Sequence, residues 1–277
     1  MRAALIQLCS SDDPATNLPV TQGLVADAAA QGAQLIVTPE VTNCVSGSRD
    51  RQNLVLQHEG DDITLAALRA QAADLRIWLV IGSLALKTDD ADGRFANRSF
   101  LIGPDGGIVA RYDKIHMFDV QVTPEETYRE SAGFRPGTRA VLAQAGDLRI
   151  GMTVCYDVRF GHLHHALAQA GAQVLTVPAA FSPVTGAAHW HPLLRARAIE
   201  TGCYVLAPAQ SGQHSSTTGH KRSTYGHSLA VSPWGEVLID AGETGPGVHI
   251  VDIDATSVEE ARRKVPSLSH VRGFDGP

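Results

Sequence analysis

Three side chains in this sequence have types suited to nucleophilic chemistry at a carbonyl group: the carboxylate of Glu40, the ammonium of Lys114 and the thiol of Cys155. A cysteine sulfur can attack a carbonyl carbon, a carboxylate can take up the thiol proton, and an ammonium can stabilise the oxyanion that forms. The chain has only four lysines against nineteen arginines. A lysine in a distinctive motif is therefore a candidate for a specific role.

Cys155 follows residues 149–154, which predict a strand, and precedes a segment that predicts a helix. A nucleophile on such a turn stands clear of the sheet, near backbone amides that can bind an oxyanion. A thiol with an ordinary pKa of about 8.5 is mostly protonated at neutral pH, so it needs a base nearby. Taken singly, Cys155 also fits a core thiol, Glu40 a solvated loop carboxylate, and Lys114 a surface lysine.

The motifs around these residues resemble those of the nitrilase superfamily of carbon–nitrogen hydrolases. They are Thr-Pro-Glu40, Tyr-Asp-Lys114-Ile-His and Gly-Met-Thr-Val-Cys155-Tyr-Asp-Val-Arg-Phe, in that family's order. The resemblance runs from the first predicted strand to about His270. It implies an α/β fold, a four-layer αββα sandwich, formed as a single domain over residues 1–277. It also implies a second carboxylate, at Glu130, that keeps the lysine ammonium in place and charged, because burial alone lowers a lysine pKa.

The resemblance and the chemistry together assign a role to each residue. Glu40 takes the thiol proton, Cys155 attacks the carbonyl, and Lys114 stabilises the oxyanion together with the backbone amide of Tyr156. Protonated Glu40 then gives its proton to the leaving amine, and water hydrolyses the resulting cysteinyl thioester. This chemistry requires no metal and no other cofactor.

Further motifs resemble the branch of the family that hydrolyses deaminated glutathione. They are Gly-Ala-Ala-His189-Trp190, residues 194–201, and Tyr225-Gly-His-Ser228 with Pro233-Trp-Gly235. The omega-amidases, which act on 2-oxoglutaramate, share much of this pattern and remain the alternative. These relatives usually carry an acidic residue at the position of His162. Because this difference lies near the nucleophile, both deaminated glutathione and 2-oxoglutaramate remain candidate substrates. We predict a thiol-dependent amidase that cleaves a non-peptide or γ-type amide of a small carboxylate-bearing substrate.

Five residues near the predicted nucleophile are candidates for binding that substrate: Tyr156, Arg159, Phe181, Thr185 and His189. Phe181 and Thr185 lie beyond the predicted strand 173–177, at the sheet edge expected to hold Glu40. Arg159 and His189 can bind a carboxylate. A salt bridge between Arg159 and Asp157 is the alternative interpretation.

Three other classes of protein fit parts of the sequence. A metal-dependent hydrolase would use a histidine cluster drawn from His162, His164, His165, His189 and His191, but no further ligand or second shell is identifiable. A Cys–His hydrolase would use His116 or His162 and leave Glu40 and Lys114 without a role. A non-catalytic binding protein would normally lack one of the three core residues, and all three are present.

The elements that must position these residues alternate between strands and helices, as in an α/β protein. Predicted strands cover residues 2–8, 34–37, 77–84, 97–102, 108–112, 149–154, 173–177, 204–207, 228–232, 236–240 and 248–253; predicted helices cover 18–31, 64–75, 163–170, 191–201 and 257–264. Residues 116–138 are polar and irregular, and we interpret Glu125 and Glu126 there as solvated loop charges. Residues 32–39 resemble residues 171–178, and each segment ends a predicted strand with a proline, which indicates two sheets of similar construction.

Composition excludes several classes of function. The 277 residues carry 23 Lys plus Arg against 29 Asp plus Glu, a net charge of −6 that argues against binding nucleic acid or an anionic membrane. No apolar run approaches the roughly 20 residues that span a bilayer, and no signal peptide is evident. The four cysteines lack metal-ligand spacing. We expect a cytoplasmic enzyme with a small-molecule amide substrate, and the resemblance implies a homodimer or a larger homo-oligomer.

Overall fold

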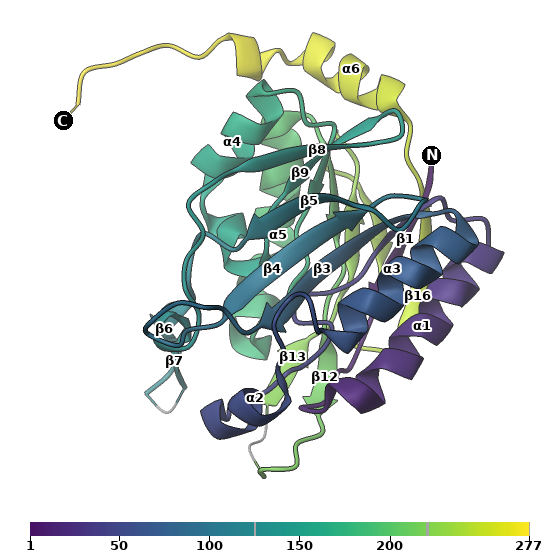
Figure 1. Ribbon diagram of the computed structural model, residues 1–277. Helices are drawn as coiled ribbons and strands as arrows, with labels where there is room; N and C mark the ends of the chain where they lie inside the picture. Colours follow the sequence, from purple (N-terminus) through teal and green to yellow (C-terminus); the bar gives the residue numbers. More distant parts are fainter. Residues whose placement is uncertain (125, 220–221, 277) are drawn as a thin grey trace.

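Two six-stranded sheets pack face to face and carry the loops that hold the predicted site (Figure 1). The structure is a computed structural model that describes residues 1–124, 126–219 and 222–276. In spatial order, the first sheet contains β16 (Gly247–Asp252), β1 (Arg2–Gln7), β2 (Leu35–Val37), β3 (Trp78–Leu86), β4 (Ala96–Ile102) and β5 (Ile108–Asp113). The second contains β15 (Val237–Asp240), β14 (Leu229–Val231), β11 (Tyr204–Ala207), β10 (Val174–Thr176), β9 (Leu148–Met152) and β8 (Val141–Ala145).

Both sheets have the same plan. In the first, β1, β2 and β3 run parallel and the flanking strands run antiparallel. In the second, β9, β10 and β11 run parallel, again with antiparallel strands on either side. The two segments that resemble each other in sequence contain β2 and β10, the central parallel strand of each sheet. The similar construction inferred from those segments is therefore present.

Helices cover the outer face of each sheet. Their bounds are α1 (Pro14–Ala30) and α3 (Ile63–Leu75) on the first sheet, and α4 (Gly161–Gln169) and α5 (Pro183–Thr201) on the second (Figure 1). One apolar core is shared by the inner faces of the two sheets and extends to α4 and α5. A second core lies between the first sheet and its two helices. The predicted αββα sandwich is confirmed.

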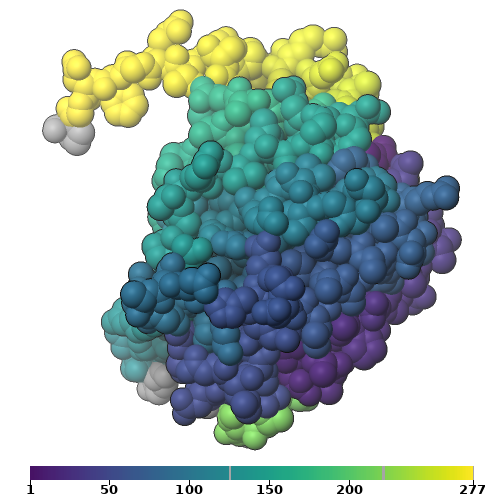
Figure 2. Space-filling view, viewed as in Figure 1, coloured from purple at the N-terminus to yellow at the C-terminus, as the bar shows by residue number. Residues whose placement is uncertain are grey.

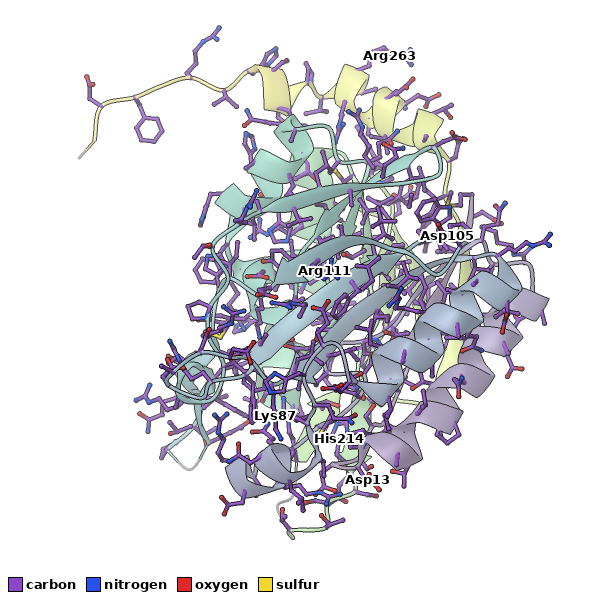
Figure 3. The ribbon with its side chains drawn as sticks, viewed as in Figure 1. Asp13, Lys87, Asp105, Arg111, His214 and Arg263 are labelled. Carbon is purple, nitrogen blue, oxygen red and sulfur yellow. The ribbon has the colours of Figure 1, made fainter. Side chains whose placement is uncertain are left out.

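The remaining elements are short. They are α2 (Arg49–Val55), α6 (Ala255–Lys264), the hairpins β6 (Asp119–Gln121)–β7 (Thr127–Arg129) and β12 (Ser211–His214)–β13 (Arg222–Tyr225), and the 3-10 helices η1 (Glu130–Ala132), η2 (Cys155–Arg159) and η3 (Ser267–Ser269). Asp13, which caps α1, lies at the same end of the molecule as His214 on β12 (Figure 3). The segment after η3 extends away from the body (Figure 2).

Some element boundaries differ from the predictions. Helix α5 begins at Pro183, eight residues before the predicted start, and contains Pro192. Proline at the first position suits a helix, whereas an internal proline removes one amide donor and obscures the pattern. The stretch 116–138 contains the β6–β7 hairpin and η1, so it is more regular than predicted; Glu125 lies outside the described residues. No helix in the described part of the chain is both long and apolar enough to cross a bilayer.

The carboxyl ends of β2 and β10 approach each other closely, and this approach creates the site. A Cβ on Gly82 of β3 would lie 1.9 Å from the Thr38 carbonyl oxygen and 2.5 Å from the Pro178 Cβ. Only glycine fits such a contact. The loops that follow Pro39 and Pro178 consequently meet across the two sheets.

Candidate active site

Glu40 follows β2 and is 4% exposed. Its Oε1 accepts hydrogen bonds from Lys114 Nζ and Asn97 Nδ2, each at 2.9 Å. Its Oε2 accepts a hydrogen bond from the Ala180 amide at 2.8 Å. Because Ala180 lies just beyond β10, the two matching strand ends jointly fix this carboxylate.

Lys114 directly follows β5 and is 2% exposed. Besides Glu40, its ammonium contacts both carboxylate oxygens of Glu130, at 2.9 and 2.8 Å. Glu130, in η1, also accepts a hydrogen bond from the Phe118 amide at 2.7 Å. A single buried ammonium thus lies between two carboxylates, and Glu130 occupies the position predicted for a lysine partner.

Cys155 opens η2 and is 7% exposed. Its φ of 50° lies in the left-handed region, which non-glycine residues rarely adopt and which is common at functional sites. The Cys155 amide donates to the Pro178 carbonyl at 2.9 Å, which holds this turn against the end of β10. The thiol and the Glu40 carboxylate lie close enough for each to shift the pKa of the other, so the nucleophile is beside its base.

The charges of these groups follow from burial and from one another. Burial, reinforced by the Glu40 carboxylate, raises the pKa of Cys155 well above its usual value. Burial alone would raise the pKa of Glu40, but the charge and hydrogen bond of Lys114 outweigh it and lower that pKa. Burial alone would lower the pKa of Lys114, but Glu130 and Glu40 raise it well above its usual value. The resting site therefore contains a neutral thiol, an ionised carboxylate and a charged ammonium.

This charge state predicts the pH dependence of activity. We expect kcat/KM to show no ionisation of an enzyme group between about pH 4.3 and about pH 8.5, the ordinary pKa values of Glu and Cys. The Glu40 pKa is lowered and the Cys155 pKa is raised, so the acid limb lies below this window and the alkaline limb above it. The profile should be recorded with a substrate that does not titrate in this range. A limb near pH 6.5 would instead indicate a histidine base.

Asn97 is a site residue that sequence reasoning missed. It lies on β4, is 2% exposed, and its Nδ2 reaches Glu40 Oε1 at 2.9 Å and Glu130 Oε1 at 3.2 Å. Its Oδ1 is buried and makes no hydrogen bond to any described residue. Asn97 therefore ties the two carboxylates together. Its place in a predicted strand gave no signal, because only the fold brings that strand beside both glutamates.

Asp157 supports the nucleophile turn in a way that differs from the prediction. The carboxylate is fully buried and accepts hydrogen bonds from the Tyr112 hydroxyl at 2.7 Å and the Val154 amide at 2.8 Å. It also contacts His116 Nδ1 at 2.7 Å. The alternative of an Asp157–Arg159 salt bridge is wrong, because these buried donors occupy the carboxylate. Arg159 instead contacts His189 Nδ1 at 3.3 Å.

A cavity of about 1000 Å³ opens in front of the catalytic groups. Of the predicted substrate-binding residues, Tyr156 and Phe181 line it. The Arg159 guanidinium carbon lies 5.7 Å from the Tyr156 ring centroid and 5.5 Å from the Phe181 ring centroid, and neither Arg159 nor His189 is among the described lining residues. Thr185 is also outside that lining and donates its hydroxyl to the Ser182 carbonyl.

The cavity wall carries charges that the sequence did not indicate. Arg49, Arg129 and Arg222 line it. Glu126 lines it as well and accepts hydrogen bonds from the Tyr128 hydroxyl at 2.6 Å and the Ser182 hydroxyl at 2.8 Å. The interpretation of Glu126 as a solvated loop charge is therefore wrong.

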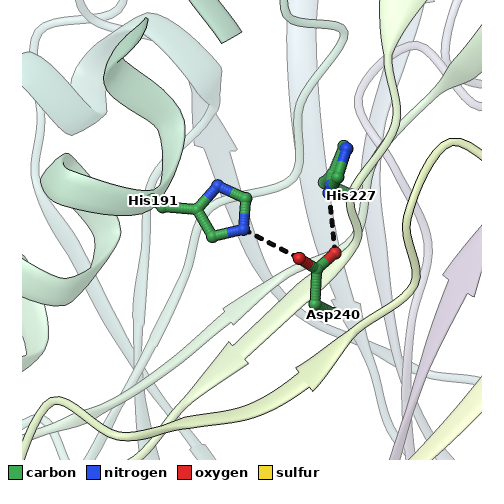
Figure 4. Close-up of side chains that lie close together, drawn as sticks. All are labelled: His191, His227 and Asp240. Atoms are coloured by element: carbon green, nitrogen blue, oxygen red, sulfur yellow. Dashed lines mark hydrogen bonds and ion pairs between the residues drawn. The ribbon is translucent and has the colours of Figure 1, made fainter. Parts of the chain in front are cut away.

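The histidines predicted as a possible metal pair do not converge. His189 and His191 are two residues apart on α5, so their side chains leave the helix in different directions. His189 contacts Arg159, whereas His191 contacts Asp240 (Figure 4). His164 is buried against the Phe160 carbonyl, and burial lowers its pKa to about 4.

Residues 2–263 match the Carbon-nitrogen hydrolase family, and the chain belongs to that family of amide-hydrolysing enzymes. The chain is 38% identical over 272 residues to the deaminated glutathione amidase of Yersinia enterocolitica, covering 97% of this chain and 92% of that protein. Saccharomyces cerevisiae Nit3, a member of branch 10 of the nitrilase superfamily, superposes with a TM-score of 0.83 and 27% identity, covering 96% of this chain and 94% of the other. An amidase from Nesterenkonia sp. AN1, solved with acrylamide added to its active site cysteine, has a TM-score of 0.76, 29% identity, and coverage of 96% and 98%.

Proposed function

We propose that this enzyme acylates Cys155 during amide hydrolysis. Ionised Glu40, which lies beside the thiol, accepts its proton, and the sulfur attacks the carbonyl carbon of the substrate. The oxyanion is stabilised by the Lys114 ammonium and the Tyr156 backbone amide. The Cys155 amide already donates to Pro178, which favours its neighbour as the second donor.

Collapse of the tetrahedral intermediate breaks the carbon–nitrogen bond. Glu40 returns its proton to the leaving amine, and Cys155 remains as a thioester of the acyl group. Glu40, again ionised, then takes a proton from a water molecule that attacks the thioester. The carbon–sulfur bond breaks, the acid is released, and Glu40 returns its proton to the Cys155 thiolate. Asn97 and Glu130 act as positioning residues, because they hold Glu40 and Lys114 rather than facing the substrate.

We propose deaminated glutathione as the substrate. The observation that carries this proposal is the cavity of about 1000 Å³, which lies at the upper end of the volumes typical of ligand sites. This substrate is a tripeptide-sized molecule with carboxylates at both ends, whereas 2-oxoglutaramate is much smaller. The arginines in the wall match two separated carboxylates. The relative from Yersinia enterocolitica carries the name of the same activity.

The test is a direct comparison of two substrates with purified protein. We expect kcat/KM for release of cysteinylglycine from deaminated glutathione to exceed that for release of ammonia from 2-oxoglutaramate. The reverse order would contradict the substrate assignment and leave the thioester mechanism untouched. Hydrolysis of neither compound would refute both candidate substrates.

Arg222 is the arginine best placed to bind a substrate carboxylate. Its Nη2 lies 3.4 Å from the Ala180 carbonyl, and the Ala180 amide contacts Glu40. We expect Arg222→Met to raise KM about 10- to 100-fold with a smaller change in kcat, since a hydrogen bond to a charged group contributes about 1.5–3 kcal/mol. Arg139→Met, at an exposed position outside the described cavity lining, is the control. Equal KM values for the two variants would contradict this role.

We further propose that residues 1–277 act as one domain, in a homodimer or larger homo-oligomer in the cytoplasm. The core shared by both sheets supports the single domain. The four cysteines are free, as expected in a reducing compartment. Val237 and Leu238 on the edge strand β15 are exposed, as is Trp234 just before it, and a second copy can cover them. Light scattering at several protein concentrations measures the oligomeric state. A monomer at every concentration would contradict the proposed homo-oligomer.

A further inference from the structure

Three potential metal ligands converge on one point away from the catalytic cavity (Figure 4). His191 lies on α5, His227 in the loop before β14, and Asp240 at the end of β15. Asp240 Oδ2 lies 2.9 Å from His191 Nε2, and Asp240 Oδ1 lies 2.8 Å from His227 Nδ1. One ligand atom from each of the three residues lies within 4.8 Å of the others.

The position of His227 is fixed by an unusual backbone conformation. Its φ is 54°, in the left-handed region, which a non-glycine residue keeps only when its surroundings enforce it. Its amide donates to the Gly242 carbonyl at 2.7 Å, and its carbonyl accepts from Trp190 Nε1 at 2.8 Å. Its ring stacks on Tyr225, with centroids 4.3 Å apart. These contacts aim the imidazole at Asp240 before any ligand arrives.

Asp240 is also held in place. Its Oδ1 accepts a hydrogen bond from the Gly242 amide at 2.9 Å, so the loop that fixes His227 also orients the carboxylate. The side chains of His191, His227 and Asp240 are 31%, 19% and 35% exposed. Solvent therefore reaches the cluster, and a metal ion can enter and keep a water molecule as a fourth ligand.

We propose that His191, His227 and Asp240 form a binding site for a divalent transition metal, with Zn²⁺ as the ion that fits best. Two imidazoles and one carboxylate are a common zinc ligand set, completed by water in a tetrahedron. Ligand atoms at the usual distance of about 2.0–2.2 Å from zinc lie about 3.3–3.6 Å from one another in a tetrahedron. The present separations of 2.8 to 4.8 Å reach that geometry through small side-chain rotations.

Zinc binding replaces the two hydrogen bonds of the cluster. Each imidazole must present a lone pair from the nitrogen that now faces Asp240, so that nitrogen must give up any proton it carries, while the other ring nitrogen can carry one. The ion then links α5 to the β14–β15 end of the second sheet. Because α5 begins at Pro183, in the wall of the cavity, the site stiffens a wall of the active site without taking part in the chemistry.

Zinc titration of chelator-stripped protein tests the proposal. The titrations use full-length Cys155→Ser protein, so the catalytic thiol cannot hold the metal, with competition against a chromogenic chelator. We expect one zinc ion per chain and a rise in melting temperature on binding. His191→Ala and Asp240→Asn should weaken binding at least tenfold and abolish that rise. His270→Ala, which removes an exposed histidine elsewhere, should bind zinc like the parent.

Cobalt(II) gives a second readout that does not depend on the stability of the variants. We expect visible absorption typical of tetrahedral nitrogen and oxygen ligation, and no thiolate charge-transfer band. A thiolate band, or zinc affinity unchanged in both His191→Ala and Asp240→Asn, would overturn the proposal. Absence of stoichiometric zinc binding by the parent protein would also overturn it and would leave a purely hydrogen-bonded cluster.

Discussion

Replacing Glu40 by glutamine is expected to lower kcat/KM by about 10³-fold or more while leaving the fold intact. Glutamine cannot accept the thiol proton, and a positioned general base contributes about 10²–10⁴-fold in each step that it serves. Glu40 serves both formation and hydrolysis of the thioester. The fold should survive because glutamine keeps the volume of the side chain and an oxygen for the Ala180 amide, and Lys114 keeps Glu130 as its partner.

Steady-state kinetics and thermal unfolding of the same preparations measure both parts of this prediction. Glu236→Gln is the matched control, since Glu236 is exposed and outside the described cavity lining, and it should retain full activity. If Glu40→Gln kept more than a tenth of the parent kcat/KM, another group would have to be the base. His116 would then be the first candidate, as the predicted Cys–His alternative requires.

Replacing Lys114 by methionine should damage both stability and activity. Methionine fills a similar volume but leaves Glu40 and Glu130 buried without the ammonium between them. Removing one partner from a buried ion pair costs about 3–5 kcal/mol of unfolding free energy. Loss of one oxyanion donor lowers kcat by about 10²–10³-fold. Urea unfolding and steady-state kinetics measure the two effects, with exposed Lys264→Met as the control.

The pH dependence of the unfolding free energy of Lys114→Met distinguishes the effect of the lost charge from the effect of altered packing. Without Lys114, burial and mutual repulsion raise the folded-state pKa of the two carboxylates above their unfolded values. The stability deficit is therefore largest above those raised values, shrinks as the pH falls through them, and is smallest below about pH 4.3, where the carboxylates become protonated in the unfolded state as well. Adding Glu130→Gln should recover much of the stability at neutral pH but none of the activity. A deficit independent of pH would contradict this account.

The architecture was predictable because its signals are local. Short apolar strands alternate with helical stretches and turn residues along the chain, and the resemblance of residues 32–39 to 171–178 reflects two sheets of one design. The predicted start of α5 was wrong because Pro192 lies inside the continuous helix, where its position resembles a helix start. The strands of the β12–β13 hairpin were not predicted because they are short and polar.

The site was predictable only in part, for a different reason. Glu40, Lys114 and Cys155 stand in recognisable motifs, and the structure brings them together with Glu130. Asn97 and the Ala180 amide were missed because their contacts with Glu40 span 57 and 140 residues of sequence. The predicted salt bridge between Arg159 and Asp157 is wrong because a buried donor from another strand, the Tyr112 hydroxyl on β5, binds the Asp157 carboxylate instead. Sequence proximity alone does not reveal such a distant partner.

The cavity also contains a second thiol, which serves as an internal control. Cys44 lines the same cavity, and burial, reinforced by Asp12, raises its pKa to about 12. It makes no hydrogen bond to Glu40 within the part of the chain that the structure describes. A covalent intermediate should therefore form on Cys155 and not on Cys44.

Rapid acid quench during turnover, followed by peptide mass spectrometry, tests that central claim most directly. With whichever of the two candidate amides is hydrolysed, we predict that the acyl mass appears on the Cys155 peptide within the first turnover. Hydroxylamine should remove it, as expected of a thioester, and Cys9, Cys44 and Cys203 should stay unmodified. Rapid turnover with Cys155 never acylated, or with the acyl group on another residue, would contradict the account.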